Sequence, residues 1–270
     1  MTHIQKADSR KPYAIRAIGL ALISILMVTS CTAANSPGPI AVTSSNHHAT
    51  EAGMQVLQDG GTAADAAFTV AAVLTIVEPW FSSVMGGGTW ALHYDAETRE
   101  VMSLDGVGPA ASGATTEFYN QPGIGGSVGM HQALVPGAWG GWMEWLKAYG
   151  SKDLDELLEP AIRLAEEGFE IYDAMAGWMN RRSGNIASWE YSRAVYMPDG
   201  ELLSTGDTLR QPDMAETLRE VSRVYRDALS EGRDAAFDAA NDYFYRGPIA
   251  ESIVEYSDAH GGLFELSDFT

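Results

Sequence analysis

The sequence predicts an α+β protein, in which a few β-strands accompany a larger number of α-helices. Three patterns indicate this fold class. Two helical patterns lie within residues 49–78, alternation typical of a β-hairpin follows over 89–105, and helical periodicity dominates again from Gly137 onward. With 270 residues, of which 46% are hydrophobic, the chain is long enough to bury a sizeable core.

The first 30 residues have the organisation of a bacterial lipoprotein signal peptide. Four basic residues precede an apolar run over 17–28, which is too short for a helix that spans a bilayer. The run ends in Val-Thr-Ser-Cys31, which resembles a lipobox, and Cys31 is the single cysteine. We expect lipidation of Cys31 and a periplasm-facing place in the cell envelope, in the outer membrane because Thr32 is not aspartate. The alternative is an ordinary signal peptide with an incidental cysteine.

Residues 31–39 have the composition of a short flexible tether, and 40–270 form the predicted folded domain. The apolar run 40–44 is typical of a short buried strand. A helix over 49–58 is predicted to end at a glycine pair. A second helix, which starts at the capping pattern Thr62-Ala-Ala-Asp, is predicted to end before the proline of Val-Glu-Pro.

Apolar and polar residues alternate in two segments, 89–95 and 101–105, and this pattern predicts the β-hairpin. The hairpin follows the triplet Gly86–Gly88 and leaves through the stretch LDGVGPAAS (104–112), which we expect to be an exposed turn loosened by glycines. Four helices are predicted after it, over 137–150, 154–168, 213–229 and 249–262.

The net charge and the motif content argue against several classes of partner and cofactor. The net charge of −19, without clustered lysines and arginines, argues against nucleic acid as a partner. The sequence has no phosphate-binding loop, no Gly-x-Ser-x-Gly motif and no His-Glu-x-x-His motif, so we expect no cofactor and no metal. His47 and His48 are adjacent, and adjacent side chains point apart, so we interpret this pair as part of a helix start.

Two further features favour a structural interpretation. Backbone N–H groups of Gly86–Gly88 can cradle an oxyanion, but a glycine triplet more often permits a close backbone approach. Trp139, Trp142 and Trp145 lie at three-residue intervals. This spacing predicts an aromatic stripe that packs in the core or in an interface.

Several motifs also follow one another in a specific order. Residues 42–106 contain a histidine pair, Glu-Ala-Gly, Gly-Gly-x-Ala-x-Asp-Ala-Ala, Val-Glu-Pro and Gly-Gly-Gly before the hairpin. The segments VPGAWGGWMEWLKAYG (135–150), LLEPAIRLAEEGFEI (157–171) and YFYRGPIAESIVEYSDAHGGLFELSDF (243–269) follow. In this order the motifs resemble the amino-terminal, large-subunit portion of the γ-glutamyltransferases, also called γ-glutamyltranspeptidases. The resemblance covers nearly everything after the tether.

The resemblance implies an N-terminal-nucleophile (Ntn) hydrolase with an αββα sandwich, incomplete here because the chain ends within the large subunit. Such precursors cleave themselves, so that a threonine becomes the first residue of a small subunit. Its hydroxyl attacks a γ-glutamyl (glutathione-type) amide, its own α-amine acts as the base, and the acyl group passes to an amino acid, a peptide or water.

The nucleophilic threonine is expected beyond this chain, so no catalytic residue is predicted within it, and Thr270 is not taken as the nucleophile. The implied partners are a small-subunit polypeptide that carries the threonine and a small γ-glutamyl or acyl amide substrate. The membrane is expected to be a partner only through the lipid anchor. The chain alone is expected to be inactive.

One departure from the family pattern lies at the hairpin exit. The family carries Asp-x-Arg-Glu there, and its arginine holds the α-carboxylate of the substrate. This chain reads Asp105-Gly-Val107-Gly108, so valine stands at the arginine position and glycine at the glutamate position. An apolar side chain cannot pair with a carboxylate, and loss of such a contact costs about 2–5 kcal/mol.

Three hypotheses follow from this departure. The first is an acylase-like substrate that lacks the α-carboxylate. The second is that another basic residue replaces the missing arginine, with Arg99, Arg181 or Arg182 as candidates. The third is a degenerate, non-catalytic envelope lipoprotein that binds rather than cleaves.

Overall fold

Helices make up most of the structure, a computed structural model that describes residues 39–124 and 129–270. Cys31 and the predicted signal peptide lie outside the described residues. From Ala41 to Thr270 the described chain forms one compact unit. None of the described helices combines the length and the hydropathy that a membrane crossing requires.

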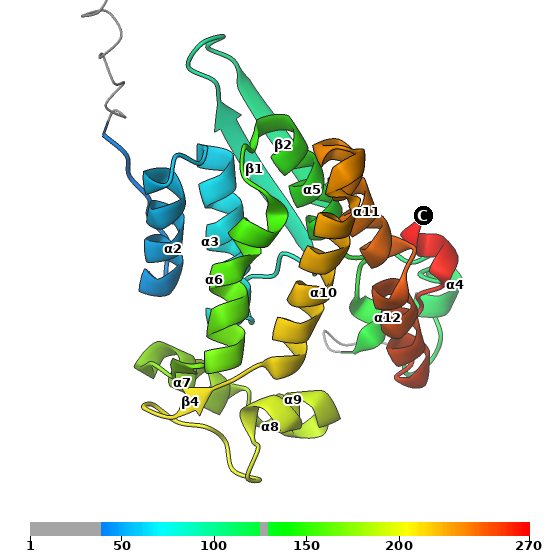
Figure 1. The fold of residues 1–270 in the computed structure, drawn as a ribbon. Coiled ribbons are helices and arrows are strands. Elements are labelled where there is room, and N and C mark those ends of the chain that lie inside the picture. The colour runs from blue at the N-terminus through cyan, green and yellow to red at the C-terminus, as the bar shows by residue number, and fades with distance from the viewer. Residues whose placement is uncertain (1–38, 125–128) are drawn as a thin grey trace, which may run out of the picture. The chain divides into compact units, whose positions relative to one another are not determined.

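The longer helices are α2 (His47–Gln58), α3 (Ala63–Val77), α5 (Ala138–Tyr149), α6 (Leu154–Glu167), α7 (Asp173–Arg181), α10 (Pro212–Ala228), α11 (Arg233–Tyr245) and α12 (Pro248–Ala259). The shorter ones are α4 (Thr116–Tyr119), α8 (Ser183–Ser188), α9 (Glu190–Tyr196) and the 3-10 turns η1 (Met130–Gln132), η2 (Leu229–Glu231) and η3 (Leu266–Phe269). In Figure 1, α3, α6 and α10 run side by side, and the contacts along the chain agree: α3 packs on α6, α6 on α10, and α10 on α11.

Helix α5 connects this helical layer to the hairpin. It packs against α3 and α11 on the helical side and against both hairpin strands on the other. Its aromatic stripe is fully buried in the main core: Trp139, Trp142 and Trp145 are at most 7% exposed. The prediction that these tryptophans serve packing is therefore confirmed.

The hairpin consists of β1 (Gly88–Tyr94) and β2 (Val101–Val107), which pair antiparallel from Gly88 opposite Val107 to Tyr94 opposite Val101. A second, two-residue ladder joins β3 (Phe169–Glu170) and β4 (Thr208–Leu209). One face of the hairpin packs on α5. The other face is open and apolar, with four large side chains that are 60–76% exposed: Trp90, Leu92, Tyr94 and Val101.

The open hairpin face fits the αββα sandwich that the resemblance described above implies. In that fold two sheets stack face to face between helical layers, and the inner faces are apolar. The described residues supply helices and one hairpin, and no second sheet that covers it. The described residues thus form an α+β arrangement whose sheet layer is incomplete.

The structure corrects some of the predicted elements. Residues 40–44 form no strand, because no described segment pairs with them and an isolated strand leaves its backbone groups without partners. Helices α7, α8, α9 and α11 were not predicted. The segment of α7–α9 is rich in Gly, Asn and Ser and lacks a clear period, whereas α11 has a usable apolar spacing in Ala236, Phe237, Ala240 and Phe244.

The start of α3 shows how the sequence fixes a helix and ties it to a distant loop. Thr62 and Asp65 form the predicted capping box. Asp65 is fully buried, and its carboxylate accepts hydrogen bonds from the Thr62 N–H at 2.8 Å, the Ser151 N–H at 3.0 Å and the Ser151 hydroxyl at 2.9 Å. Because Ser151 follows α5, this one carboxylate joins the start of α3 to the α5–α6 connection.

We predict that Asp65→Asn lowers the free energy of unfolding by about 2–4 kcal/mol, because an amide nitrogen would face buried donors that now share a carboxylate. Urea unfolding followed by circular dichroism measures this loss. The control is Asp59→Asn at the end of α2, where among the described residues the carboxylate accepts only from the exposed Gln55 amide. The control should change the free energy of unfolding by less than about 0.5 kcal/mol, and equal losses in both variants would contradict the prediction.

Candidate functional site

Val107 is the last residue of β2 and lies opposite Gly88, the first residue of β1. Its side chain is 38% exposed, and its N–H donates to Oδ1 of Asp105 at 3.3 Å. The expectation of a loosened, exposed turn is wrong at this point. Strand β2 continues through Gly106, which is buried, to Val107 itself. Val107 therefore stands at the end of a paired strand.

Gly108 follows Val107 and touches another part of the backbone. A Cβ atom at Gly108 would lie only 1.7 Å from the carbonyl oxygen of Val135, and a Cβ at Gly137 would lie 2.1 Å from the Gly108 nitrogen. Real Cβ atoms do not approach so closely, so both positions require glycine. A glutamate at position 108, as in the family pattern, does not fit this backbone.

Two backbone hydrogen bonds hold the contact. The Val135 N–H donates to the Pro109 carbonyl at 3.0 Å, and the Gly137 N–H donates to the Gly87 carbonyl at 2.8 Å. Three segments, 86–88, 106–108 and 135–137, thus meet backbone to backbone, and we call this the glycine junction. The interpretation of Gly86–Gly88 as a close backbone approach is confirmed at Gly88, where a Cβ would lie 3.2 Å from the Cα of Val107. Gly87 has open space beside it, and its φ of +28° favours glycine.

The three arginines considered as replacements for the missing one lie elsewhere. Arg99 is in the turn at the opposite end of the hairpin, with a φ of +61°. The six residue steps between Val101 and Val107 correspond to roughly 20 Å of strand. Arg181 ends α7, and Arg182 lines a cavity with residues of α7, α8 and α9. Nothing in these placements brings a guanidinium to Val107.

Sequence reasoning missed a fourth arginine. Arg246, just after α11, lines a cavity of about 280 Å³ together with Gly108 and Pro109. Its guanidinium pairs with Asp242 one helical turn earlier, and both side chains are more than half exposed. No local signal marks Arg246, because 138 positions separate it from Gly108 in the sequence and only the fold places them on one cavity.

The histidine pair lies at the start of a helix. His47 opens α2, and Asn46 caps the helix by accepting from the His48 N–H at 2.9 Å. Burial, and then the neighbouring His47, hold the pKa of His48 below its ordinary value. Within the described residues no three His, Cys, Asp or Glu side chains gather as metal ligands would. The interpretation of the histidine pair as a helix start is confirmed.

Thr270, which the sequence analysis does not take as the nucleophile, donates its hydroxyl to the Ser267 carbonyl at 2.9 Å.

Comparison with known proteins relates this geometry to characterised relatives. The gamma-glutamyltranspeptidase family model matches residues 49–270. The chain is 32% identical over 251 residues to an acylase ACY 1 proenzyme of Pseudomonas sp. strain SE83. It is also 32% identical over 226 residues to a glutathione hydrolase proenzyme of Bacillus subtilis strain 168. These alignments cover 88% and 82% of this chain but 42% and 36% of the two relatives.

Among solved structures, the gamma-glutamyltranspeptidase of Helicobacter pylori superposes with a TM-score of 0.74 at 29% identity. That match covers 86% of this chain and 65% of the other. The chain therefore has the fold of these proteins over most of its own length, and it spans about two fifths of the length of the curated relatives that it matches.

The glycine junction predicts a sharp difference between two glycines. We expect Gly108→Ala to lower the free energy of unfolding by about 3 kcal/mol or more, since the new Cβ would overlap a backbone carbonyl that cannot rotate away. The matched control is Gly184→Ala within α8, where a Cβ meets nothing within 4 Å. Urea unfolding should show a neutral or slightly stabilising effect for the control. A Gly108→Ala variant as stable as the control would disprove the close contact.

Proposed function

Because the chain belongs to the gamma-glutamyltranspeptidase family, we propose that it forms part of an Ntn enzyme that cleaves an amide bond and passes the acyl group to water or to an amine. The nucleophile is the hydroxyl of a threonine at the start of a small-subunit polypeptide. The hydroxyl adds to the amide carbonyl while the threonine's own α-amine takes its proton. The C–N bond then breaks, the amine leaves with a proton, and water or a second amine releases the acyl group from the ester.

This chain contributes the wall of the site rather than the nucleophile. The open hairpin face is the surface on which the second sheet of the sandwich stacks, and its four exposed apolar side chains support that role. In this proposal Val107, at the end of β2 opposite Gly88, stands where the family's arginine reaches the substrate. The glycine junction holds that strand end rigidly against the start of α5.

The observation that carries the substrate assignment is Val107 beside Gly108. A valine offers no charge and no hydrogen bond, and the backbone at Gly108 excludes a glutamate that could orient a cation. A substrate α-carboxylate buried here would remain unpaired, at a cost of about 2–5 kcal/mol. We therefore propose an acyl amide substrate whose acyl group lacks an α-carboxylate. Overall similarity does not decide this, because the acylase and the glutathione hydrolase are equally identical to the chain.

One observation favours a second candidate, a γ-glutamyl amide. Arg246 lines the cavity beside Gly108, and its exposed pairing with Asp242 contributes little stability. A guanidinium released from that pair is available to a carboxylate that enters the cavity. In this case Arg246, rather than Arg99, Arg181 or Arg182, would replace the missing arginine.

The site of action follows from the N-terminal sequence. We propose that Cys31 carries a lipid after signal cleavage and that the enzyme works in the periplasm, tethered to the envelope by residues 31–39. The support is the position of the single cysteine directly after a short apolar run.

A substitution at Val107 tests the substrate assignment. In the complete protein, with its small subunit, we expect wild type to cleave simple acyl anilides better than γ-glutamyl anilide. Val107→Arg should raise the ratio of kcat/KM for γ-glutamyl over acyl anilide by at least about tenfold, because it restores a cation for the α-carboxylate. The matched control is Val107→Gln, which lengthens the side chain at the same position without adding a charge.

An unchanged ratio in Val107→Arg would remove position 107 as the determinant of specificity. A wild-type enzyme that prefers γ-glutamyl anilide and loses this preference in Arg246→Gln would support the second candidate instead. Gel electrophoresis of the complete gene product adds a separate check. Absence of self-cleavage, together with absence of turnover on both anilides, would leave only the non-catalytic hypothesis.

Cys31→Ser should move the mature protein from the membrane pellet to the soluble fraction of lysed cells and abolish labelling by a fatty-acid probe, since the cysteine proposed to carry the lipid is replaced. Fractionation followed by immunoblotting measures the first effect. Thr32→Ser, which keeps the cysteine, should remain membrane-bound. A labelled or membrane-bound Cys31→Ser variant would show that the anchor lies elsewhere.

A further inference from the structure

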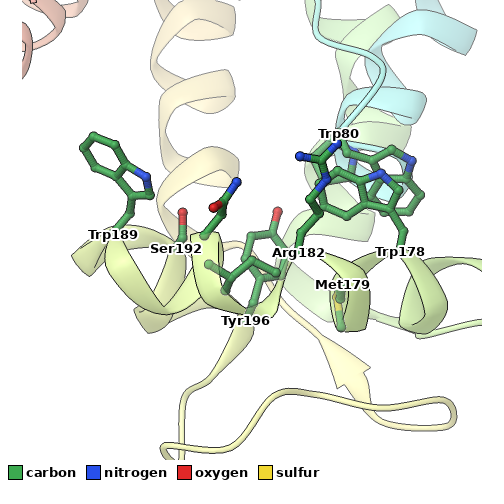
Figure 2. Close-up of a pocket in the computed structure, with 10 residues that line it drawn as sticks. Trp80, Trp178, Met179, Arg182, Trp189, Ser192 and Tyr196 are labelled. Atoms are coloured by element: carbon green, nitrogen blue, oxygen red, sulfur yellow. The ribbon is translucent and has the colours of Figure 1, made fainter. Parts of the chain in front are cut away.

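A cavity of about 240 Å³ lies away from the glycine junction, among α7, α8, α9 and the loop that follows α3. Its walls are mainly apolar, formed by Pro79, Trp80, Trp178, Met179, Ile186 and Trp189. Figure 2 shows Trp80, Trp178 and Arg182 gathered at one end and Trp189 at the other, with Ser192 and Tyr196 between them. We call this space the tryptophan cavity.

The aromatic walls have a defined geometry. The rings of Trp80 and Trp178 stack with centroids 5.1 Å apart and an interplanar angle of 19°. The guanidinium of Arg182 lies over the Trp178 ring, 6.0 Å from its centroid. This cation–π contact holds the guanidinium at the edge of the cavity and uses none of the guanidinium N–H donors.

Four polar side chains line the cavity without using their hydrogen-bonding groups elsewhere. Within the part of the chain that the structure describes, no hydrogen bond or ion pair engages the side chains of Arg182, Asn185, Ser192 and Tyr196. Burial raises the pKa of Tyr196 to about 12, and the hydroxyl is a hydrogen-bond donor at neutral pH as in any tyrosine. Arg182 and Asn185 are exposed and Ser192 and Tyr196 are partly buried, so solvent reaches this lining. A few polar groups placed around an apolar cavity are typical of a ligand site.

The volume of the cavity and the charge of its lining indicate which class of ligand it binds. An apolar cavity of about 150 Å³ holds a benzene ring, so the tryptophan cavity has room for one ring and a short polar extension. Arg182 supplies a fork that pairs with a carboxylate through two hydrogen bonds. A single cation suits a singly charged carboxylate. The net charge of the chain weighs little here, because charges further away than about 10 Å are largely screened at physiological salt.

We propose that the tryptophan cavity binds a small aromatic carboxylate, with its ring against Trp178 and Trp80 and its carboxylate on Arg182. Ser192, Asn185 and Tyr196 supply further donors to the same carboxylate or to a polar substituent. This site does not depend on the proposed amidase activity, since its residues are separate from Val107, the glycine junction and the missing threonine.

Isothermal titration calorimetry on the complete protein tests the site with two probes, 3-phenylpropionate and its neutral amide, 3-phenylpropionamide. Wild type should bind the carboxylate at least about tenfold more tightly than the amide, because only the carboxylate pairs with the guanidinium. Arg182→Gln should abolish this preference while the amide binds as before. Trp178→Leu should weaken both probes by at least about tenfold, since it removes the stacking wall.

The chain offers a matched control in Arg181, an exposed arginine at the neighbouring position that does not line the cavity. Arg181→Gln should keep the wild-type preference for the carboxylate. Equal binding of both probes to wild type, no detectable binding of either, or equal effects of the two arginine substitutions would each overturn the proposal. Circular dichroism of each variant verifies that it is folded, and a Tyr196→Phe variant, which keeps the shape of the wall, should weaken the carboxylate by a few fold.

Discussion

The contact between Gly108 and the carbonyl of Val135 is the constraint on which the functional part of this structure depends. It joins the end of β2 to the segment that starts α5, and the junction leaves no room for a Cβ at Gly108 or at Gly137. Since α5 also packs on α3 and α11, the junction transmits the position of the helical core to the strand end. A hairpin held only by its own ladder would be free to pivot at its base. Here the base is fixed, and Val107 with it.

The sequence predicted those parts of the fold that local chemistry determines. The capping box at Thr62, the glycine after α6 and the proline after α3 mark helix ends through their own dihedral and hydrogen-bonding properties, and these predictions are confirmed. The strand at 40–44 was wrong because a strand depends on a partner. The end of β2 was placed too early because Gly106 and Gly108 resemble turn residues in isolation. Their real roles, a close approach to Thr89 and Gly141 for Gly106 and to residues 135–137 for Gly108, have no local signal.

The candidate site also combines features that the sequence predicts locally with features that only the fold determines. The motif comparison directed attention to position 107, and the structure places it at the end of a paired strand beside the glycine junction. The sequence alone could not identify which arginine lies near position 107, because distance along the chain says little about distance in the fold. Arg99 is only eight positions from Val107 and lies at the far end of the hairpin, whereas Arg246 shares a cavity with the next residue. The tryptophan cavity was missed for the same reason, since its walls come from separate segments.

The two differences from the family pattern, at positions 107 and 108, differ in how strongly the surrounding backbone constrains them. Position 107 is half open, and an arginine there would meet Asp105 on the same strand face, a carboxylate that already points toward it through the Val107 N–H. Position 108 is closed by the Val135 carbonyl, so a glutamate requires the backbones to separate. The valine is therefore a reversible change of side chain, while the glycine is part of the architecture. On this backbone an arginine at position 107 would have Asp105, and no glutamate at position 108, as its neighbouring carboxylate.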